Sequence, residues 1–239
     1  MQEPEIVRVN TIKDILGLLS DPAMQYYPIC NDANGLPWVT NGPEIKFFGE
    51  VKIEVRETAK GPDEFWMIGR RYGWAVALVL TKAGDVVLNI QSKPGLAVAS
   101  LEMPAGGIGK DPRRSKDDIC ALTVTEVLRE TGYTGTPLYL GFSIIESGKF
   151  FDPAVKEFLD TDGKPLEPGV GRGLRAHLIM IDEAELVAVP QPRLTEKIKT
   201  ILVPVPILLD LIRNSVLVET SAVNCVTQAL LQGRLAKFL

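Results

Sequence analysis

The sequence predicts a domain in which helices pack on a mixed, largely antiparallel β-sheet, of the α+β or α/β class. Three observations point to this class. Strand-like patterns recur between residues 46 and 91, one well-marked helix follows at residues 115–131, and helical patterns dominate from about Leu194 onward. A run of strands followed by helices, without strict alternation of the two, favours a sheet that contains antiparallel pairs.

The first half of the chain contains one short helix and a series of strands. Thr11 can cap a helix whose apolar residues follow at helical spacing. Lys46–Arg56 alternates like a half-buried strand, and Phe65–Arg70 is its candidate hairpin partner. Gly73–Leu80 is apolar enough to be buried on both faces, and Val86–Gln91 returns after the turn KAGD.

The second half begins with the clearest helix, Ser115–Thr131, which Ser115 can cap and which Gly132 can end in the left-handed conformation. Strands at Pro137–Ser143 and Arg175–Ile181 follow. Between them lies an irregular stretch, residues 146–173, of a length that usually serves function or is disordered. Three further helices are predicted, at Thr195–Leu202, Ile207–Arg213 and Thr220–Gln232.

Composition narrows the function classes. The 239 residues include 26 Lys and Arg against 30 Asp and Glu, a net charge of −4, which argues against a nucleic-acid partner. The longest apolar run, Trp74–Leu80, is far shorter than the ~20 residues that a membrane span needs. Cys30, Cys120 and Cys225 form no CxxC pair and are expected to be reduced structural residues. We therefore expect a cytoplasmic enzyme or binding protein.

Glu126 and Glu130 are the first candidates for chemistry. They are four residues apart on the predicted helix, so both carboxylates project from one face. Facing a pocket, such a pair suits a hard divalent cation, because Mg²⁺ prefers oxygen ligands and substrate phosphates. Facing water, the same pair is an ordinary solvated surface, and the pair alone does not decide between these two readings.

The surrounding residues Leu101–Tyr133 (LEMPAGGIGKDPRRSKDDICALTVTEVLRETGY) resemble the Nudix box, GX5EX7REUXEEXGU, where U is a bulky apolar residue. The opening EMPAGG and the closing ETGY are similar to the ADP-ribose and ADP-sugar pyrophosphatase branch of the Nudix hydrolases. Gly106 matches the first glycine of the box, Glu126 the Glu of its RE pair and Glu130 the last Glu of its EE pair. The resemblance implies a Nudix fold: an α/β/α sandwich with a mixed sheet, N-terminal antiparallel strands and, here, extra C-terminal helices.

The chain also departs from the box. Thr125 stands where the box has Arg, and Arg129 stands where it has the first Glu of the EE pair. The early box Glu falls on or near Asp111 and Pro112, and the stretch from Gly106 to Thr125 is about five residues too long. A cation beside a proposed metal ligand should lower the number or the affinity of bound metal ions by repulsion. Alternatively, Arg129 contacts a substrate phosphate.

The resemblance implies metal-assisted hydrolysis of a phosphoanhydride. Mg²⁺, with Mn²⁺ as a substitute, is expected on Glu126, Glu130 and the carbonyl of Ala105, where it would offset charge on the diphosphate. The branch places a catalytic base on the loop before the last strand, here residues 146–173. GRGL at 171–174 contains no acid, so the candidates are four loop acids, with Glu167 preferred as the one nearest the strand: Glu157, Asp160, Asp162 and Glu167.

Further residues are candidates for binding the substrate. The first strands of related enzymes supply aromatic and basic groups to the nucleobase, and aromatic rings and arginines suit an adenine and its phosphates. Aromatic strand residues are more often part of a core. The substrate-binding residues predicted here are Arg56, Trp66, Arg70, Glu102, Arg129 and Arg172. His177, the only histidine, lies among apolar strand residues and is expected to be structural.

Three parts of the chain are predicted: an N-terminal helix and strand region (1–72), a Nudix domain (73–193) and a helical C-terminal extension (194–239). The expected function is hydrolysis of a nucleoside diphosphate derivative such as ADP-ribose or an ADP-sugar. A Nudix fold that binds a nucleotide or protein without hydrolysis, and a hydrolase of a non-nucleoside diphosphate, are the alternatives. The resemblance also implies a homodimer, since related ADP-sugar enzymes build the pocket from two chains.

Overall fold

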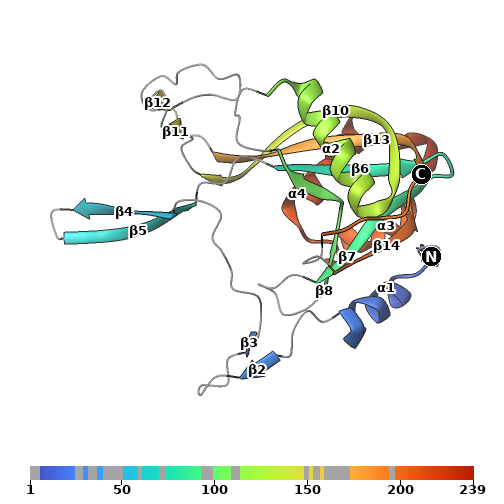
Figure 1. Cartoon of the computed structure of the whole chain (residues 1–239), viewed down its shortest axis with the longest axis horizontal. Helices are drawn as coiled ribbons and strands as arrows, with labels where there is room; N and C mark the ends of the chain where they lie inside the picture. Colours follow the sequence, from blue (N-terminus) through green and yellow to red (C-terminus); the bar gives the residue numbers. More distant parts are fainter. Residues whose placement is uncertain are drawn as a thin grey trace.

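The computed structural model describes residues 6–24, 29–31, 37–39, 51–58, 61–69, 74–92, 99–108, 114–147, 151–152, 157–158, 173–193 and 197–239. An eight-stranded sheet organises most of this part of the chain (Figure 1). Its main path runs β1-β14-β7-β6-β13-β10, while β8 pairs with β7 and β9 pairs with β6. The strands are β1 (Val7–Arg8), β6 (Trp74–Thr81), β7 (Asp85–Ser92), β8 (Ala99–Glu102), β9 (Ala105–Gly107), β10 (Tyr133–Ser147), β13 (Gly173–Leu186) and β14 (Lys197–Pro204).

The sheet is mixed, as predicted. β1 is parallel to β14 and β13 is parallel to β6, whereas the other pairs are antiparallel. Helices lie on both faces: α2 (Lys116–Thr131) in front, and the orange-red helices α3 (Val205–Arg213) and α4 (Thr220–Leu231) behind (Figure 1). The predicted α+β fold with sandwiched layers is therefore confirmed.

The alternation of strand β6 explains these layers. Ala75, Ala77 and Val79 belong to the core cluster that α2 completes with Ile119 and Val127. Val76, Leu78 and Leu80 point the other way, into the larger cluster with Leu208 of α3 and Cys225 of α4, and with Ile15 of α1 (Ile12–Leu19). Because successive strand residues face opposite sides, a strand that is apolar throughout must be covered twice.

Helix α2 begins and ends at the predicted signals. The Ser115 side chain accepts a hydrogen bond from the Asp118 backbone N–H, and the Asp118 carboxylate accepts one from the Ser115 backbone N–H, a complete capping box. At the other end Gly132 has φ +77°, and its N–H bonds to the Leu128 carbonyl. Thr11 likewise caps α1 by accepting a hydrogen bond from the Asp14 N–H. Both helix predictions are confirmed.

The helix predicted at Thr195–Leu202 is wrong, because the chain forms strand β14 there. Ile201 and Val203 face the larger core cluster while Leu202 packs on the α2 side, which is the two-residue period of a strand. Eight residues of β14 pair with β7, so tertiary pairing outweighs the local helical spacing. The C-terminal part (194–239) thus begins with a strand of the central sheet, before the predicted helices α3 and α4.

The remaining strands lie in three separate pairs. β4 (Val51–Thr58) and β5 (Gly61–Gly69) form the predicted antiparallel hairpin, and the first residues of the predicted strand, 46–50, lie outside the described residues. β2 (Ile29–Asn31) pairs with β3 (Pro37–Val39), and β11 (Phe151–Asp152) pairs with β12 (Glu157–Phe158). Two short 3-10 helices, Pro22–Met24 and Ala236–Phe238, complete the described elements.

Two of the predicted structural cysteines are buried free thiols. Cys225 of α4 is fully buried, and burial raises the pKa of its thiol to about 12. Burial also raises the pKa of Cys120 on α2. Such thiols stay protonated at neutral pH and are poor nucleophiles. In the described part of the chain, no helix has the length and apolar character to span a membrane.

Candidate functional site

The two candidate carboxylates lie where α2 meets strand β9. A Cβ atom built on Gly106 would lie 2.5 Å from Cγ and 3.0 Å from Cβ of Glu126, so only glycine fits this approach. Gly106 is held by antiparallel pairing with Ala75 of β6. The Glu126 side chain therefore passes directly over the backbone of β9, next to Ala105.

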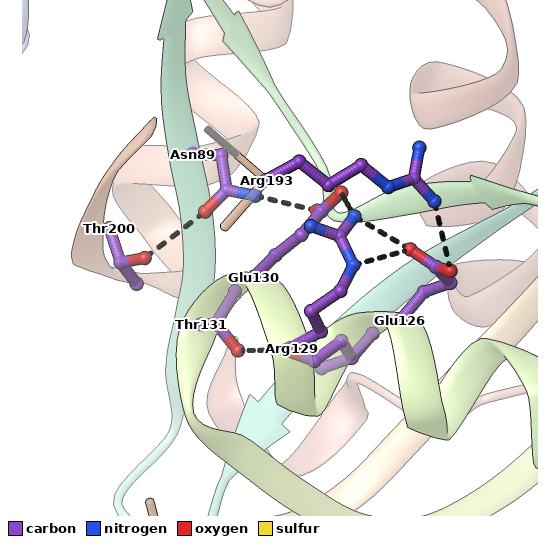
Figure 2. Close-up of polar contacts among 8 residues, drawn as sticks. Asn89, Glu126, Arg129, Glu130, Thr131, Arg193 and Thr200 are labelled. Atoms are coloured by element: carbon purple, nitrogen blue, oxygen red, sulfur yellow. Dashed lines mark hydrogen bonds and ion pairs between the residues drawn. The ribbon is translucent and has the colours of Figure 1, made fainter. Parts of the chain in front are cut away.

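Arg129 lies between the two carboxylates (Figure 2). Its Nη2 atom donates to Oε2 of Glu126 at 2.7 Å and to Oε1 of Glu130 at 3.1 Å. Its Nε atom also donates to Oε2 of Glu126, at 3.0 Å. One guanidinium thus bridges the pair and neutralises the repulsion that two carboxylates on one helical face would otherwise have.

The remaining carboxylate oxygens also have partners. Oε2 of Glu130 accepts a hydrogen bond from Nδ2 of Asn89 on β7 at 3.1 Å, and Oδ1 of Asn89 accepts one from Oγ1 of Thr200 on β14 at 3.2 Å. Oε1 of Glu126 lies 3.5 Å from Nη2 of Arg193 (Figure 2). All four oxygens of the two carboxylates are therefore engaged by this chain's own donors.

Burial differs between the members of the cluster. The side chain of Glu130 is only 6% exposed, those of Glu126 and Arg129 are 22% and 21% exposed, and that of Arg193 is 64% exposed. Glu130 is thus the inner anchor, and Arg193 is the member most open to an approaching ligand. The charges of the two carboxylates and the two guanidinium groups sum to zero.

Comparison with known proteins bears on the fold. The crystal structure of an ADP compounds hydrolase matches this chain with a TM-score of 0.54 and 12% sequence identity, over 82% of this chain and 92% of the hydrolase. The chain has the fold of that hydrolase. A NUDIX hydrolase from Nitrosomonas europaea matches 68% of this chain and 90% of its own length, with 15% identity and a TM-score of 0.41. Neither a family model nor a curated protein matches the sequence.

The match to the ADP compounds hydrolase shows a shared fold, and a fold alone does not specify an activity. The residues that resemble the Nudix box nevertheless lie close together in space. Gly106, at the position of the first glycine of the box, lies against the side chain of Glu126. Arg129, at the position of a box Glu, bridges Glu126 and Glu130. The departure from the box is therefore part of the site.

Two further predicted residues lie near the cluster. Glu102 on β8 is directly opposite Asn89 of β7, and its Oε1 accepts a hydrogen bond from Ser100 Oγ at 2.6 Å. Ala105 pairs with Val76 of β6 and precedes Gly106. In the described residues, no group of three or more His, Cys, Asp or Glu side chains is arranged so that it could hold a metal ion.

Other predicted residues cannot be placed in the site. Arg70, Glu167 and Arg172 lie outside the described residues. Arg56 and Trp66 belong to strands β4 and β5, but their side chains lie outside the described part. Among the loop acids, Asp160 and Asp162 lie outside the described residues, while only the backbone of Glu157 is described, in β12.

His177 has the structural setting expected of it. Its side chain is buried on β13, and its Nδ1 atom lies 2.8 Å from the Tyr139 hydroxyl on β10. Lys116 at the start of α2 lies over the Tyr139 ring, 5.3 Å from its centroid. The His177 ring, the Tyr139 ring and the Lys116 ammonium group thus lie together where β13, β10 and the start of α2 meet.

Sequence reasoning missed Asn89, Thr200 and Arg193. A signal existed for Asn89, because an amide in the middle of the apolar strand VVLNIQ must find a polar partner when buried. Thr200 carries no such signal, because the residues around it predict a helix. Arg193 follows β13 in an irregular segment, where spacing gives no indication of its direction.

We expect Asn89→Leu to lower the free energy of unfolding by about 1 to 3 kcal/mol, because it leaves the buried Glu130 carboxylate without one donor and Thr200 without its acceptor. Urea unfolding measures the change. Thr200→Val is the matched control, since it removes only the outer hydrogen bond and should cost less. Equal stability of Asn89→Leu and the unaltered protein would contradict a supporting role for Asn89.

Proposed function

We propose that this protein hydrolyses the diphosphate linkage of a nucleoside diphosphate derivative of the ADP-ribose or ADP-sugar kind. The observation that carries the proposal is the placement of Glu126 and Glu130 on one face of α2, against the backbone of Gly106. The fold shared with an ADP compounds hydrolase supports it. Homodimerisation and a cytoplasmic location stay predictions from the sequence.

The donor set at the site fits a hard divalent cation by its chemistry. Two carboxylates and the neighbouring carbonyl of Ala105 are oxygen donors of the kind that Mg²⁺ and Mn²⁺ prefer. When bound by Glu126, Glu130 and the Ala105 carbonyl, such a cation would offset the charge that develops on the diphosphate. The place between the carboxylates is taken by Arg129.

The arginines of the cluster are suited to the diphosphate itself. A guanidinium donates in a planar fork that matches phosphate oxygens. Arg193 is largely exposed at the edge of the cluster, so an incoming diphosphate can reach it without displacing a buried group. We assign to Arg193 the first contact with the phosphates of the ligand. Glu126 and Glu130 form the inner wall of the site. The catalytic base stays a prediction, with Glu167 preferred.

The test is an assay of ADP-ribose, ADP-glucose and NADH with Mg²⁺ or Mn²⁺, repeated with Glu126→Gln and Glu130→Gln. We expect each substitution to lower turnover by about 100-fold or more, the size of effect seen when one preorganised electrostatic group is removed from an active site. Glu185→Gln is the control, because Glu185 of β13 is an exposed carboxylate that pairs with Lys82 outside the cluster. Undiminished turnover in both site variants would rule out the assignment.

A second function, nucleotide binding without hydrolysis, is favoured by one observation. Arg129 donates three hydrogen bonds to the two carboxylates, and together with Arg193 it balances the negative charges of the pair without any added ion. Under this alternative, ADP-ribose binds with the same affinity in the presence of EDTA as with Mg²⁺, and no product forms. Stimulation of cleavage by millimolar Mg²⁺ would eliminate it.

A further inference from the structure

We infer that Arg129 is an internal cation that occupies the Glu126–Glu130 pair in the ligand-free protein, and that a divalent cation binds there only when a diphosphate draws the guanidinium away. The identity of the ligand, a diphosphate, rests on the proposed function. The part that concerns the free protein does not depend on turnover, and it can be tested by metal binding alone.

The geometry supplies the first argument. A single nitrogen, Nη2 of Arg129, lies within hydrogen-bond distance of one oxygen from each carboxylate, as a shared cation would. Mg²⁺ needs carboxylate oxygens at about 2.0–2.1 Å. Oε2 of Glu126 accepts from both Nε and Nη2 of Arg129. A metal ion and the guanidinium therefore cannot share the space between these oxygens.

Electrostatics supplies the second argument. Glu130 is nearly buried and Arg129 is about four-fifths buried, so their charges interact in a medium less polarisable than water. The positive charge of the Arg129 guanidinium would repel a divalent cation placed beside it. The carboxylate pair would attract that cation little, because Arg129 and Arg193 already neutralise the charge of the pair. The pair thus lacks the negative charge that attracts Mg²⁺.

The main chain of Arg129 is fixed, so any release involves its side chain only. The residue lies in the last turn of α2, where a cation interacts favourably with the helix dipole. Its carbonyl oxygen accepts a hydrogen bond from the Gln191 N–H at 2.7 Å, which ties the helix to the segment after β13. The long side chain can still exchange partners, because its rotamers are independent of these main-chain bonds.

A diphosphate is the ligand that can compete for the guanidinium. It offers several anionic oxygens, and two of them can accept the parallel N–H bonds of one planar guanidinium group. Transfer of Arg129 to the ligand would uncover Oε2 of Glu126 and Oε1 of Glu130 next to the phosphates. A cation site would then exist only in the complex, which makes metal binding ordered after the diphosphate.

The experiment measures Mn²⁺ binding by the electron paramagnetic resonance signal of the free ion. We expect Arg129→Gln to bind one Mn²⁺ at least about tenfold more tightly than the unaltered protein, since a competing unit charge is removed. Arg129→Met, which keeps an apolar stem of similar length, is the second variant. The matched control is Arg213→Gln, because Arg213 on α3 pairs with Asp210 at the same i,i+3 spacing but on the surface.

A second measurement tests the ligand's part. A non-hydrolysable ADP-ribose analogue, with a methylene group in place of the bridging anhydride oxygen, should raise the Mn²⁺ affinity of the unaltered protein at least about tenfold and that of Arg129→Gln much less. Adding Glu126→Gln to Arg129→Gln should abolish the gained site, which assigns the ion to this pair.

The outcomes are separable. Equal Mn²⁺ affinity of the unaltered protein and both Arg129 variants, each with an intact thermal unfolding transition, would overturn the inference. If either variant gains Mn²⁺ while the analogue has no effect on the unaltered protein, Arg129 is a permanent replacement for the metal and the ligand-driven step is wrong. If the gain and the analogue effect both appear but no substrate is cleaved, the proposed hydrolysis fails and the inference about Arg129 stands.

Discussion

Replacing Gly132 with alanine is expected to lower the free energy of unfolding by about 3 to 5 kcal/mol, a loss in the upper range for single substitutions. Two costs add at this position. Gly132 has φ +77°, where an L-residue pays about 1 to 2 kcal/mol. In addition, a Cβ atom there would lie 2.1 Å from the carbonyl oxygen of Ala188, a main-chain atom that cannot turn aside.

The cost would extend to the candidate site. The Gly132 carbonyl accepts hydrogen bonds from the Val187 and Ala188 N–H groups, at 3.0 and 3.2 Å. These bonds hold the segment that leads from β13 to Arg193, whose guanidinium contacts Glu126. Pushing Ala188 away from the helix end would therefore also displace Arg193.

The matched control is Gly233→Ala. Gly233 also has a positive φ, +69°, but a Cβ atom there meets nothing within 4 Å, so only the conformational cost of about 1 to 2 kcal/mol applies. Urea unfolding of the two variants separates the clash from the conformational cost. Equal destabilisation in both would show that the contact between Gly132 and Ala188 carries no energy.

The contrast between α2 and β14 shows where sequence reasoning succeeded. The ends of α2 are set by local chemistry, since Ser115, Asp118 and Gly132 act within one helical turn of the ends that they define. Residues 197–204 contain the same kinds of apolar residues, and Pro204 at their end marks a boundary without showing whether a helix or a strand ends there. Their structure is decided by the partner strand β7, far away in the sequence, and the local pattern could not reveal that partner.

The candidate site divides in the same way. Glu126, Arg129 and Glu130 share one helical face, so their proximity followed from spacing, and the resemblance to the Nudix box singled out Arg129 as a departure. The spacing did not reveal that the guanidinium of Arg129 would bridge both carboxylates, because a side chain at the same position on the helix can also extend into water. Asn89 and Thr200 are 111 residues apart, and only the order of strands in the sheet brings them together behind Glu130.

Gly106→Ala should impair function with little loss of fold. Gly106 cannot retreat, because its strand is paired with β6, and α2 cannot move away, because Val127 is fully buried beneath it. The new methyl group would therefore force the Glu126 side chain out of its rotamer and away from Arg129. Displacement of a catalytic group by about 1 Å can cost 10²-fold in rate, so we expect turnover of ADP-ribose to fall about 100-fold.

Gly107→Ala is the matched control, since a Cβ atom on the next residue of β9 meets nothing within 4 Å and should leave turnover unchanged. A readout that does not need catalysis is available in the Arg129→Gln background. There Gly106→Ala should weaken Mn²⁺ binding by about tenfold or more, because the ion would lose the Glu126 oxygens, while Gly107→Ala should not. If the two alanine variants behave alike in both assays, the close approach of β9 to Glu126 does not position that carboxylate. In that case the Glu126 side chain would tolerate the added methyl group, and it would not be the rigidly held carboxylate that the proposed site requires.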